Sequence, residues 1–492
     1  MSSLEDFHTF LKKKGFIYPS SELYGGLAGF YDYGHLGTLL KHNFENQWRN
    51  FFLNLSDNFF EIETANIMHQ NVFKASGHLD NFIDPIIKCT QCQFNDRADH
   101  FLESQLKARF EGLSPTELDT LIQKNKLQCP QCKHKLKPVE VLNMMFPINL
   151  GTTTTNQAYL RPETAQSPYV NFRLQYEIQR KKMPLGLALV GRAYRNEISP
   201  RNLTLRQREF TQAELQIFFN PANIKEHPDF KSIENKKLLV VLTKDRKKTT
   251  TPEIPAKDLI KTLPQFYVYH LAKIQEFYLT VLKIPKTHFR LYQLNDKEKA
   301  FYNKYHFDLE INLNHLGFTE MGGLHYRTDH DLQGHQRVSQ QNLEVLDEQT
   351  NKKYLPHVLE LSFGVDRNVY ALLALNYLED TKRGNIVLKL PSSFTPFQVA
   401  VFPLVKNKSP ITKLAQKIYQ QLKPCYSCFY DESSSVGKRY ARADEIGVSY
   451  IITVDFDSLK DQAVTVRDRN TTKQQRIKIS ELNNYLYKLY QK

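Results

Sequence analysis

Two stretches in the middle of the chain alternate between apolar and polar residues, with the period of two that is typical of strands. They cover Leu187–Glu197 and Phe210–Phe219, and a polar segment with Arg201, Arg206 and Arg208 separates them. This spacing predicts an antiparallel hairpin with a long arginine-bearing loop. One face of the hairpin carries charged and amide side chains, so it either meets a ligand or is a solvated face with ion pairs.

A third stretch, Val358–Leu375, predicts a short strand followed by a helix. The strand presents Glu360 and Ser362 on one face, and the chain turns at Gly364. Arg367 falls in the first turn of the helix, where the helix dipole disfavours a cation. A nearby anionic ligand or carboxylate would compensate for this position, although an exposed first-turn arginine is the simpler alternative.

Glycine and proline residues around a short apolar strand indicate a domain boundary near residue 390. After it, strand-like runs alternate with a helical stretch at Ile411–Leu422, which predicts a compact α/β domain over 391–492. A larger domain over 1–390 contains two predicted insertions, at about 82–140 and about 221–264. The second insertion is rich in lysine, threonine and proline, which favours an exposed excursion over a core element.

The composition points to an acidic partner. The chain has 492 residues, 41% of them hydrophobic, and 66 Lys and Arg against 52 Asp and Glu, a net charge of +14. This length predicts at least two domains and excludes a small disulfide-stapled module. The charge favours nucleic acid or a phosphate-rich ligand, although solvated surface lysines are the alternative. The N-terminus is not typical of a secretory signal and no apolar run has transmembrane length, so we expect a cytoplasmic protein without a membrane.

All six cysteines fall in Cys-x-x-Cys pairs, which in a long intracellular chain indicates metal binding rather than disulfides. Two pairs lie in the first insertion and together supply four thiolates, the set that zinc prefers. A structural zinc is therefore expected there, with four free thiols as the alternative. Cys425 and Cys428 have no partner pair and are expected to stay reduced. The predicted zinc ligands are Cys89, Cys92, Cys129 and Cys132.

Taken together, the hairpin and the strand-to-helix stretch resemble a known family. Arg195-x-Glu197, a loop and Phe210, followed by Gly364-x-x-Arg367, look like motifs 2 and 3 of the class II aminoacyl-tRNA synthetases. Several sequence segments are similar to those of the glycyl-tRNA synthetases of the single-chain homodimeric kind. They are SSELYGGLAGFYDYG, ASGH, RPETAQ, GRAYRNEISPR, and GKRY followed by DEIG. The resemblance covers nearly the whole chain, apart from the insertion at about 221–264.

This resemblance implies an α+β fold, in which an antiparallel sheet flanked by helices carries inserted subdomains and a C-terminal α/β anticodon-binding domain. It implies a ligase that activates glycine with ATP to glycyl-adenylate and transfers the glycyl group to tRNA-Gly. It also implies Mg²⁺ as a cofactor. The segment 25–48 resembles motif 1, which pairs subunits in this class, so a homodimer is expected.

The resemblance assigns roles at the nucleotide end. Arg195 would hold the α-phosphate and the activated carboxylate, Glu197 would contact the adenine amine, and Phe210 and Arg367 would sandwich the adenine. Glu320 resembles an acidic contact to ATP and metal. The residues implied in ATP binding are Arg195, Asn196, Glu197, Leu205, Arg206, Arg208, Phe210, Glu320, Met321, Gly364 and Arg367, of which Arg195, Glu197 and Arg367 are the predicted catalytic residues.

The resemblance also assigns an amino-acid pocket and an RNA contact. Glu163, with Glu360 and Ser362, would receive the glycine ammonium group. The residues implied in glycine binding are Arg97, Glu163, Gln212, Glu214, Glu360, Ser362 and Gly364. In the C-terminal domain, a turn-rich basic segment is expected at 431–447. Its Gly437, Lys438 and Arg439 would contact tRNA, and a solvated basic loop is the alternative.

The chain departs from the family at two places. Leu361 stands where the family usually has proline, which leaves the local backbone less constrained. After Glu320 the sequence reads MGGLHYRTD, where many relatives place a bulky aromatic residue. Two rival hypotheses are a class II enzyme for another small amino acid, against which RPETAQ argues, and a non-catalytic accessory subunit, which would have lost Arg195, Glu197 or Arg367.

Overall fold

The computed structural model describes residues 3–108, 110, 112–151 and 157–490. The chain divides into two compact units. The sheet unit comprises residues 26–30 and 49–367, and the terminal unit comprises residues 1–25, 31–48 and 368–492. Within the described ranges, no helix combines the length and the apolar character needed to cross a membrane.

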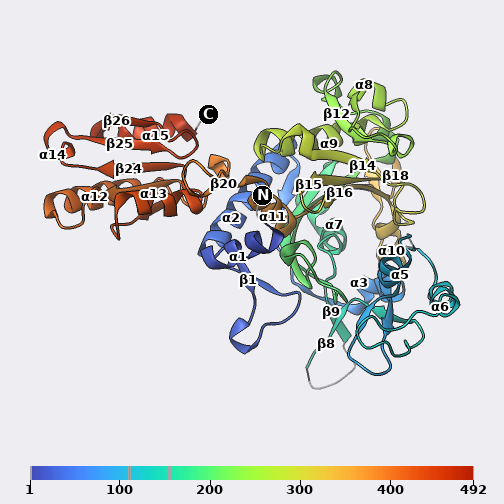
Figure 1. The fold of residues 1–492 in the computed structure, drawn as a ribbon. Coiled ribbons are helices and arrows are strands. Elements are labelled where there is room, and N and C mark those ends of the chain that lie inside the picture. The colour runs from blue at the N-terminus through green and yellow to red at the C-terminus, as the bar shows by residue number, and fades with distance from the viewer. Residues whose placement is uncertain (1–2, 109, 111, 152–156, 491–492) are drawn as a thin grey trace. The chain divides into compact units, whose positions relative to one another are not determined.

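The sheet unit is built on nine strands that run antiparallel except at two neighbouring pairs, and helices accompany them (Figure 1). This architecture confirms the predicted antiparallel sheet flanked by helices. In sheet order the strands are β13 (Glu253–Pro255), β12 (Lys237–Val241), β14 (Phe289–Gln293), β15 (Tyr305–Asn312), β16 (Phe318–Thr328), β19 (His357–Gly364), β11 (Glu209–Phe219), β10 (Leu185–Tyr194) and β3 (Phe59–Glu61). The parallel pairs are β12 with β14 and β10 with β3.

The remaining elements of the sheet unit are helices and three small sheets. The helices are α3 (Gln70–Ala75), α4 (His78–Asn81), α5 (Ala98–Leu106), α6 (Pro115–Lys124), α7 (Gln166–Ile178), α8 (Ala256–Leu259), α9 (Gln265–Glu276) and α10 (His330–Ser339). The small sheets contain β4 (Ile67–His69), β9 (Gln157–Leu160) and β8 (Phe146–Asn149); β6 (Asn95–Arg97), β5 (Ile83–Lys88) and β7 (Glu140–Asn143); and β17 (Val345–Asp347) and β18 (Lys352–Tyr354).

The predicted hairpin is present, because β10 and β11 pair antiparallel with Ala193 opposite Phe210. Its first strand ends earlier than predicted, at Tyr194, so Arg195 and Glu197 lie just beyond the strand. These two residues therefore project from the start of the arginine-bearing loop rather than from the sheet itself.

The predicted strand-to-helix turn is also present. β19 ends at Gly364, and α11 (Val365–Asn376) begins at the next residue and places Arg367 in its first turn. β19 lies between β16 and β11, and β11 is the second strand of the hairpin. The turn at the end of β19 is therefore next to the hairpin in the sheet. The two stretches that sequence singled out thus share one region of the fold.

The helix α7 covers one end of one sheet face. Its Tyr169 and Phe172 pack with Leu187 of β10 and Phe218 of β11, and the Phe172 and Phe218 rings stack with centroids 4.4 Å apart. Burying side chains of this size stabilises the fold by about 1.5–3 kcal/mol each. Leu187 lies opposite Gln216 in the register, so the same face turns from apolar to polar along the strands.

The second insertion corrects one prediction from the sequence. The segment 221–264 is not only an exposed insertion, because it contributes β12 and β13 to the edge of the main sheet. Leu238, Leu239, Val240 and Val241 of β12 are buried, and Val240 pairs with Leu291 of β14. Apart from Lys237, the lysines and threonines that suggested an exposed insertion lie outside this short apolar strand, which explains why composition was misleading.

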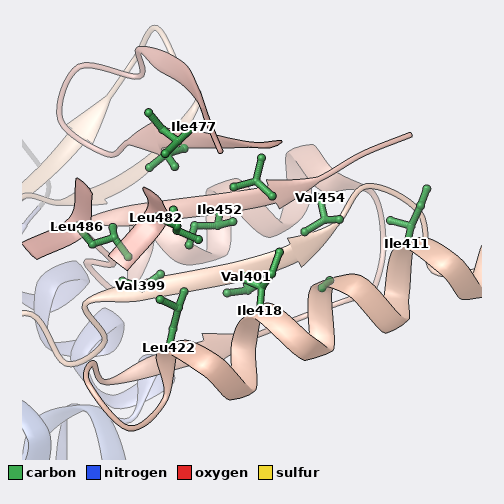
Figure 2. Close-up of a cluster of buried hydrophobic side chains, with 13 residues drawn as sticks. Val399, Val401, Ile411, Ile418, Leu422, Ile452, Val454, Ile477, Leu482 and Leu486 are labelled. Atoms are coloured by element: carbon green, nitrogen blue, oxygen red, sulfur yellow. The ribbon is translucent and has the colours of Figure 1, made fainter. Parts of the chain in front are cut away.

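The C-terminal part of the terminal unit is a five-stranded sheet with helices packed against it. A hydrophobic core lies between the strands and these helices. Figure 2 shows Val401, Ile452 and Val454 of the strands facing Ile418 and Leu422 of a helix. This helix covers the predicted helical stretch at 411–422. In sheet order the strands are β23 (Cys428–Tyr430), β22 (Val399–Pro403), β24 (Tyr450–Val454), β25 (Ala463–Asp468) and β26 (Gln474–Lys478), and the helices are α12 (Ser409–Leu422), α13 (Val436–Glu445), α14 (Ser458–Asp461) and α15 (Leu482–Tyr490).

The segment 431–447 is less turn-rich than predicted, because its middle forms the helix α13. This helix buries Arg439, Ala443 and Asp444 on one face, so tertiary packing overrides the local turn residues. The other elements of the terminal unit are α1 (Leu4–Lys14), β1 (Ile17–Pro19), β2 (Tyr31–Tyr33), most of α2 (His35–Phe52), the rest of α11, β20 (Tyr377–Asp380) and β21 (Asn385–Leu388).

Candidate active site

A cavity of about 500 Å³ lies in the sheet unit. Its lining includes the polar residues on one face of β11 and β19. Its walls come from the hairpin, from β16 and β19, from the first turn of α11 and from the loop before β15. This volume suits a small-molecule substrate. The residues that sequence predicted and that line it are Arg97, Glu163, Arg195, Glu197, Leu205, Arg206, Phe210, Gln212, Glu214, Glu320, Met321, Glu360, Ser362, Gly364 and Arg367.

Two predicted residues lie outside the lining of this cavity. Asn196 and Arg208 line a second, smaller cavity next to the four-cysteine cluster. Arg208 donates from Nε to the Glu197 carbonyl at 2.9 Å and from Nη1 to the Ala28 carbonyl at 2.9 Å. Its guanidinium therefore braces the loop that carries Glu197.

The strand register gathers polar side chains into one row. Ser362 lies opposite Glu214, and Glu360 lies opposite Gln216. Ser362 Oγ donates to Glu214 Oε1 at 2.7 Å, and Gln212 Nε2 donates to the same oxygen at 2.8 Å. Because alternate residues of a strand share a face, the period of two in the sequence builds this row directly.

Sequence reasoning missed the cation that holds the row together. Arg327 of β16 is buried, donates to both carboxylate oxygens of Asp331 at 2.8 and 2.9 Å, and donates to Glu360 Oε2 at 3.1 Å. Its Nη2 also lies 3.6 Å from Glu163 Oε1. Burial raises the pKa of Glu163 and of Glu360, but the Arg327 guanidinium outweighs it and holds both below their usual range.

Glu214 titrates in the opposite direction. Burial, together with the negative charges of Glu360 and Glu163, raises its pKa to about 8. The Arg327 guanidinium helps to keep Glu163 and Glu360 ionised, and the third carboxyl keeps its proton near neutral pH. A cation bound beside the row would allow Glu214 to ionise.

Arg195 projects into the cavity between two aromatic rings. Its guanidinium carbon lies 5.2 Å from the Phe210 ring centroid and 5.5 Å from the Phe82 ring centroid, and its Nε donates to the Pro162 carbonyl at 3.0 Å. Cation–π contacts of this kind hold the guanidinium plane. The arginine is thereby held in place within the lining of the cavity.

Glu197 pairs with an arginine of the loop. Arg206 Nη2 lies 2.8 Å from Glu197 Oε1. Burial raises the pKa of Glu197, but the Arg206 guanidinium more than offsets this and lowers the pKa below its ordinary value. The carboxylate therefore stays ionised and is able to accept a hydrogen bond from an amine.

The first turn of α11 resolves the electrostatic question that the sequence raised. Arg367 Nη1 lies 3.1 Å from Glu320 Oε1, and Arg367 Nε donates to the Leu205 carbonyl at 3.1 Å. Both the carboxylate and the carbonyl compensate for a cation at the positive end of the helix. Phe210 lines the same cavity, so a planar group has an aromatic face and a guanidinium within one site.

Arg97 reaches the cavity from the first insertion. It donates to Asp99 Oδ1 at 3.0 Å and to Asp99 Oδ2 at 2.6 Å, and it pairs with Asp84 at 3.2 Å. Both carboxylates hold the guanidinium in place in the lining of the cavity.

The four cysteines of the first insertion come together. Their sulfur atoms all lie within 4.8 Å of one another, and Cys89 lies 3.4 Å from Cys132 while Cys92 lies 3.6 Å from Cys129. Sulfur atoms about 3.8 Å apart fit tetrahedral zinc with its Zn–S bonds of about 2.3 Å. The donor set therefore fits a structural zinc.

The predicted tRNA contacts need one correction. Gly437 and Lys438 are exposed in the first turn of α13. Arg439 is buried instead, and it donates to the carbonyls of Pro403 and Leu404 at 2.5 and 3.1 Å. The guanidinium ties α13 to the end of β22 and is not available on the surface.

Several functional candidates had no clear sequence signal. Arg327 and Asp331 are four residues apart, but only the register of β16 against β19 places the arginine beside Glu360. Gln216 donates to Glu360 at 2.9 Å and continues the alternation of Gln212 and Glu214, so the period of two could have found it. The other cavity-lining residues that sequence reasoning missed are Met144, Thr204, Gln207, Thr211, Ala300, Tyr302, Asn303, His306, Gly322, Gly323, His325 and Asp366.

Comparison with known proteins connects this site to a family. The chain is 37% identical over 559 aligned residues to the glycine–tRNA ligase of Pyrococcus horikoshii, with 97% of each chain covered. It is 35% identical to the glycine–tRNA ligase of Methanocaldococcus jannaschii, which covers 96% of this chain and 97% of the relative. Residues 398–489 match the family described as anticodon binding domain.

Solved structures show the same fold at low sequence identity. The prolyl-tRNA synthetase of Cryptosporidium parvum, in complex with L-proline and AMP, superimposes with a TM-score of 0.60 and 13% identity, covering 99% of this chain and 75% of that one. A structure of the RNA binding domain of threonyl-tRNA synthetase from Cryptosporidium parvum Iowa II gives a TM-score of 0.62 at 17% identity, with 98% of each chain covered.

Proposed function

The chain belongs to the glycine–tRNA ligase family, and from that premise we propose which of its residues carry out each part of the reaction. The enzyme joins glycine to ATP and passes the glycyl group to tRNA-Gly. The chemical step exchanges the bond between the α- and β-phosphates for a bond between the glycine carboxylate and the α-phosphate. Positioning and charge stabilisation therefore supply most of the rate.

The nucleotide end lies between the hairpin and α11. Arg195 neutralises charge on the α-phosphate while the carboxylate attacks, and the two aromatic rings beside it keep its guanidinium in place. Phe210 and Arg367 hold the adenine ring between them, and the Glu197 carboxylate accepts from the adenine amine. Supporting positions in this proposal are Asn196, Leu205, Arg206, Arg208, Met321 and Gly364.

Mg²⁺ would neutralise the phosphate tail, and the Glu320 carboxylate is the side chain proposed to hold it together with the phosphates. Glu320 is half exposed and already lies beside Arg367, so its carboxylate is accessible from the cavity.

The amino-acid end is the carboxylate row. The glycine ammonium group binds beside Glu163, Glu214 and Glu360, while Ser362 and Gln212 orient Glu214. Arg97 would attract the anionic substrate groups from the opposite edge. Because glycine has no side chain to bind, specificity comes from excluding larger amino acids by steric conflict at the crowded strand faces.

One observation carries this assignment: Glu163, Glu214 and Glu360 line one cavity, and the negative charges of Glu360 and Glu163 hold back the ionisation of Glu214, so a ligand cation beside them is favoured. Glycine-dependent ATP–pyrophosphate exchange tests it, with alanine, serine and threonine measured beside glycine. Exchange is expected with glycine alone. Equal exchange with alanine would contradict the proposed pocket and favour a class II enzyme for another small amino acid. A folded protein that binds tRNA and exchanges with none of them would favour the accessory subunit.

The titration of Glu214 predicts a pH dependence for glycine binding. With a pKa of about 8, roughly one tenth of the Glu214 side chains are ionised at pH 7 and most are ionised at pH 9. Only the ionised form attracts the ammonium group, so the KM for glycine is expected to fall about tenfold between these pH values. The change should be seen in pyrophosphate exchange, and Glu214→Gln should abolish it. A KM that changes equally in Glu214→Gln would contradict this origin.

Further parts of the proposal concern the rest of the molecule. Residues 391–492 act as the anticodon-binding domain after a catalytic domain over 1–390, with Gly437 and Lys438 of α13 as RNA contacts. Cys89, Cys92, Cys129 and Cys132 hold a structural zinc. A homodimer formed through the segment 25–48 and a cytoplasmic location complete the proposal.

A further inference from the structure

Two histidines that neither the alternation nor the family motifs singled out form a link at the floor of the cavity. His325 of β16 lies opposite Glu360 of β19 on one side and opposite His306 of β15 on the other. His325 Nδ1 lies 2.5 Å from Glu360 Oε1, and His325 Nε2 lies 3.0 Å from His306 Nε2. His306 Nε2 lies 3.0 Å from Asp308 Oδ1. Three neighbouring strands thus carry a continuous chain of four polar groups.

For a neutral His325 ring, the contacts indicate where the hydrogens lie. Glu360 is an acceptor, because Arg327 and Gln216 both donate to its Oε2. His325 must therefore carry hydrogen on Nδ1 and donate to Oε1. Two ring nitrogens 3.0 Å apart need one hydrogen between them, and in the neutral His325 ring Nε2 is an acceptor.

His306 supplies that hydrogen. Both of its polar contacts are at Nε2, and among the described residues its Nδ1 has no hydrogen-bond partner. The hydrogen therefore lies on Nε2, between His325 Nε2 and Asp308 Oδ1. Asp308 and His306 together set the tautomer of His325, in the way that an outer carboxylate orients a functional imidazole.

The backbone makes room for this arrangement. A Cβ at position 323 would lie 2.4 Å from His325 Nε2 and 3.4 Å from His306 Nε2, so Gly323 leaves space for the two rings. Both histidines line the cavity, and their side chains keep 16% and 14% of their exposure. They differ in this respect from histidines that only fill a core, because they lie on the surface that meets the substrate.

We propose that His325 is a positioning residue for glycine: it holds the Oε1 edge of Glu360 toward the cavity, and His306 with Asp308 holds His325 in the tautomer that this requires. The proposal rests on the assignment of Glu360 to the ammonium pocket. Arg327, Gln216 and Tyr169 all donate to Oε2, whereas the contact at Oε1 is that of His325, so its loss would leave Oε1 less well positioned. The nucleotide end shares no hydrogen bond with the link among the contacts above.

The experiment compares matched substitutions in glycine-dependent ATP–pyrophosphate exchange. His325→Ala removes the donor, and the KM for glycine is expected to rise about 10- to 100-fold, the effect of losing a hydrogen bond to a charged group. His325→Asn retains a donor near the position of Nδ1, so it should restore most of the affinity. His306→Ala should give a smaller increase, and His306→Gln, which retains a donor near Nε2, should be close to wild type.

Two features separate positioning from a merely structural role. The KM for ATP and the kcat should change less than threefold in these variants, and His306→Ala should add nothing in the His325→Ala background because both act through one contact. His357→Asn is the matched control, since His357 is a half-buried histidine of β19 that bonds to Tyr326 and does not line the cavity.

The proposal is overturned if His325→Ala leaves the KM for glycine unchanged, or if it raises the KM for ATP equally. If His325→Ala does not fold, the His306→Ala and His306→Gln pair decides, because an equal KM for glycine in both would also overturn it. A wild-type protein without glycine-dependent exchange would instead refute the residue assignments of the active site. The two failures are therefore distinct.

Discussion

Replacing Arg195 by alanine is expected to lower the kcat of glycine-dependent pyrophosphate exchange by about 10²–10³-fold, the usual effect of losing one preorganised group that stabilises transition-state charge. The guanidinium is held in advance by Phe82, Phe210 and the Pro162 carbonyl, so no reorganisation is needed during the reaction. Because the charge it meets develops mainly in the transition state, kcat and kcat/KM should fall together.

Arg192→Ala is the matched control for this measurement. Arg192 lies three residues before Arg195, within β10, but it pairs with Glu209 at 3.4 Å and does not line the cavity. Its loss should leave exchange within about twofold of wild type, since a half-exposed ion pair contributes about 0–1 kcal/mol. Arg195→Lys should fall between wild type and Arg195→Ala, because lysine keeps the charge but loses the planar stacking. Equal rates in Arg195→Ala and Arg192→Ala would refute the role of Arg195.

The elements that sequence predicted best are those that carry a local period. Alternation of apolar and polar residues predicts the hairpin strands, and apolar residues at helical spacing predict the helix after Gly364. The same alternation places Gln212 and Glu214 on one face, so part of the pocket could be predicted from spacing alone. The roles of these residues came from family resemblance, and they stay predictions until mutants are measured.

The parts that sequence missed depend on contacts between distant segments. Arg327 is an unremarkable arginine in the sequence, and only the pairing of β16 with β19 places it beside Glu360. Arg439 belongs to a basic stretch that suggests RNA, yet the carbonyls at the end of β22 bind its guanidinium inside the domain. β12 is too short to stand out from the polar residues around it. In each case tertiary packing decides what a local pattern leaves open.

The charges of the site explain why these distant contacts matter. A row of carboxylates would be too costly to bury alone, and Arg327, which also pairs with Asp331, keeps Glu163 and Glu360 ionised while Glu214 stays protonated. The negative charges of Glu360 and Glu163 therefore oppose the ionisation of Glu214. If this row binds the ammonium group of glycine, as proposed, ligand binding and the ionisation of Glu214 are one coupled event.

Removing metal from the four-cysteine cluster is expected to unfold the segment around it while the rest of the molecule stays folded. The core of this segment is small, with Ile87, Phe101 and Leu118 among its buried apolar residues. A core of this size contributes little stability by itself, whereas structural zinc contributes on the order of 10 kcal/mol in small domains. Metal analysis of the purified protein should find about one zinc per chain, and Cys129→Ser should lose it.

Limited proteolysis measures the structural consequence of that loss. In Cys129→Ser, cleavage within 89–132 should accelerate at least tenfold, because the opened segment exposes its backbone to the protease. Cys425→Ser is the matched control, since Cys425 is exposed in the terminal unit and lies outside the cluster, and its cleavage pattern should equal that of wild type. Exchange activity should fall in Cys129→Ser as well, because Arg97 reaches the cavity from this segment. A protein that contains no zinc and resists protease equally in both variants would show that the four thiols need no metal to hold this fold.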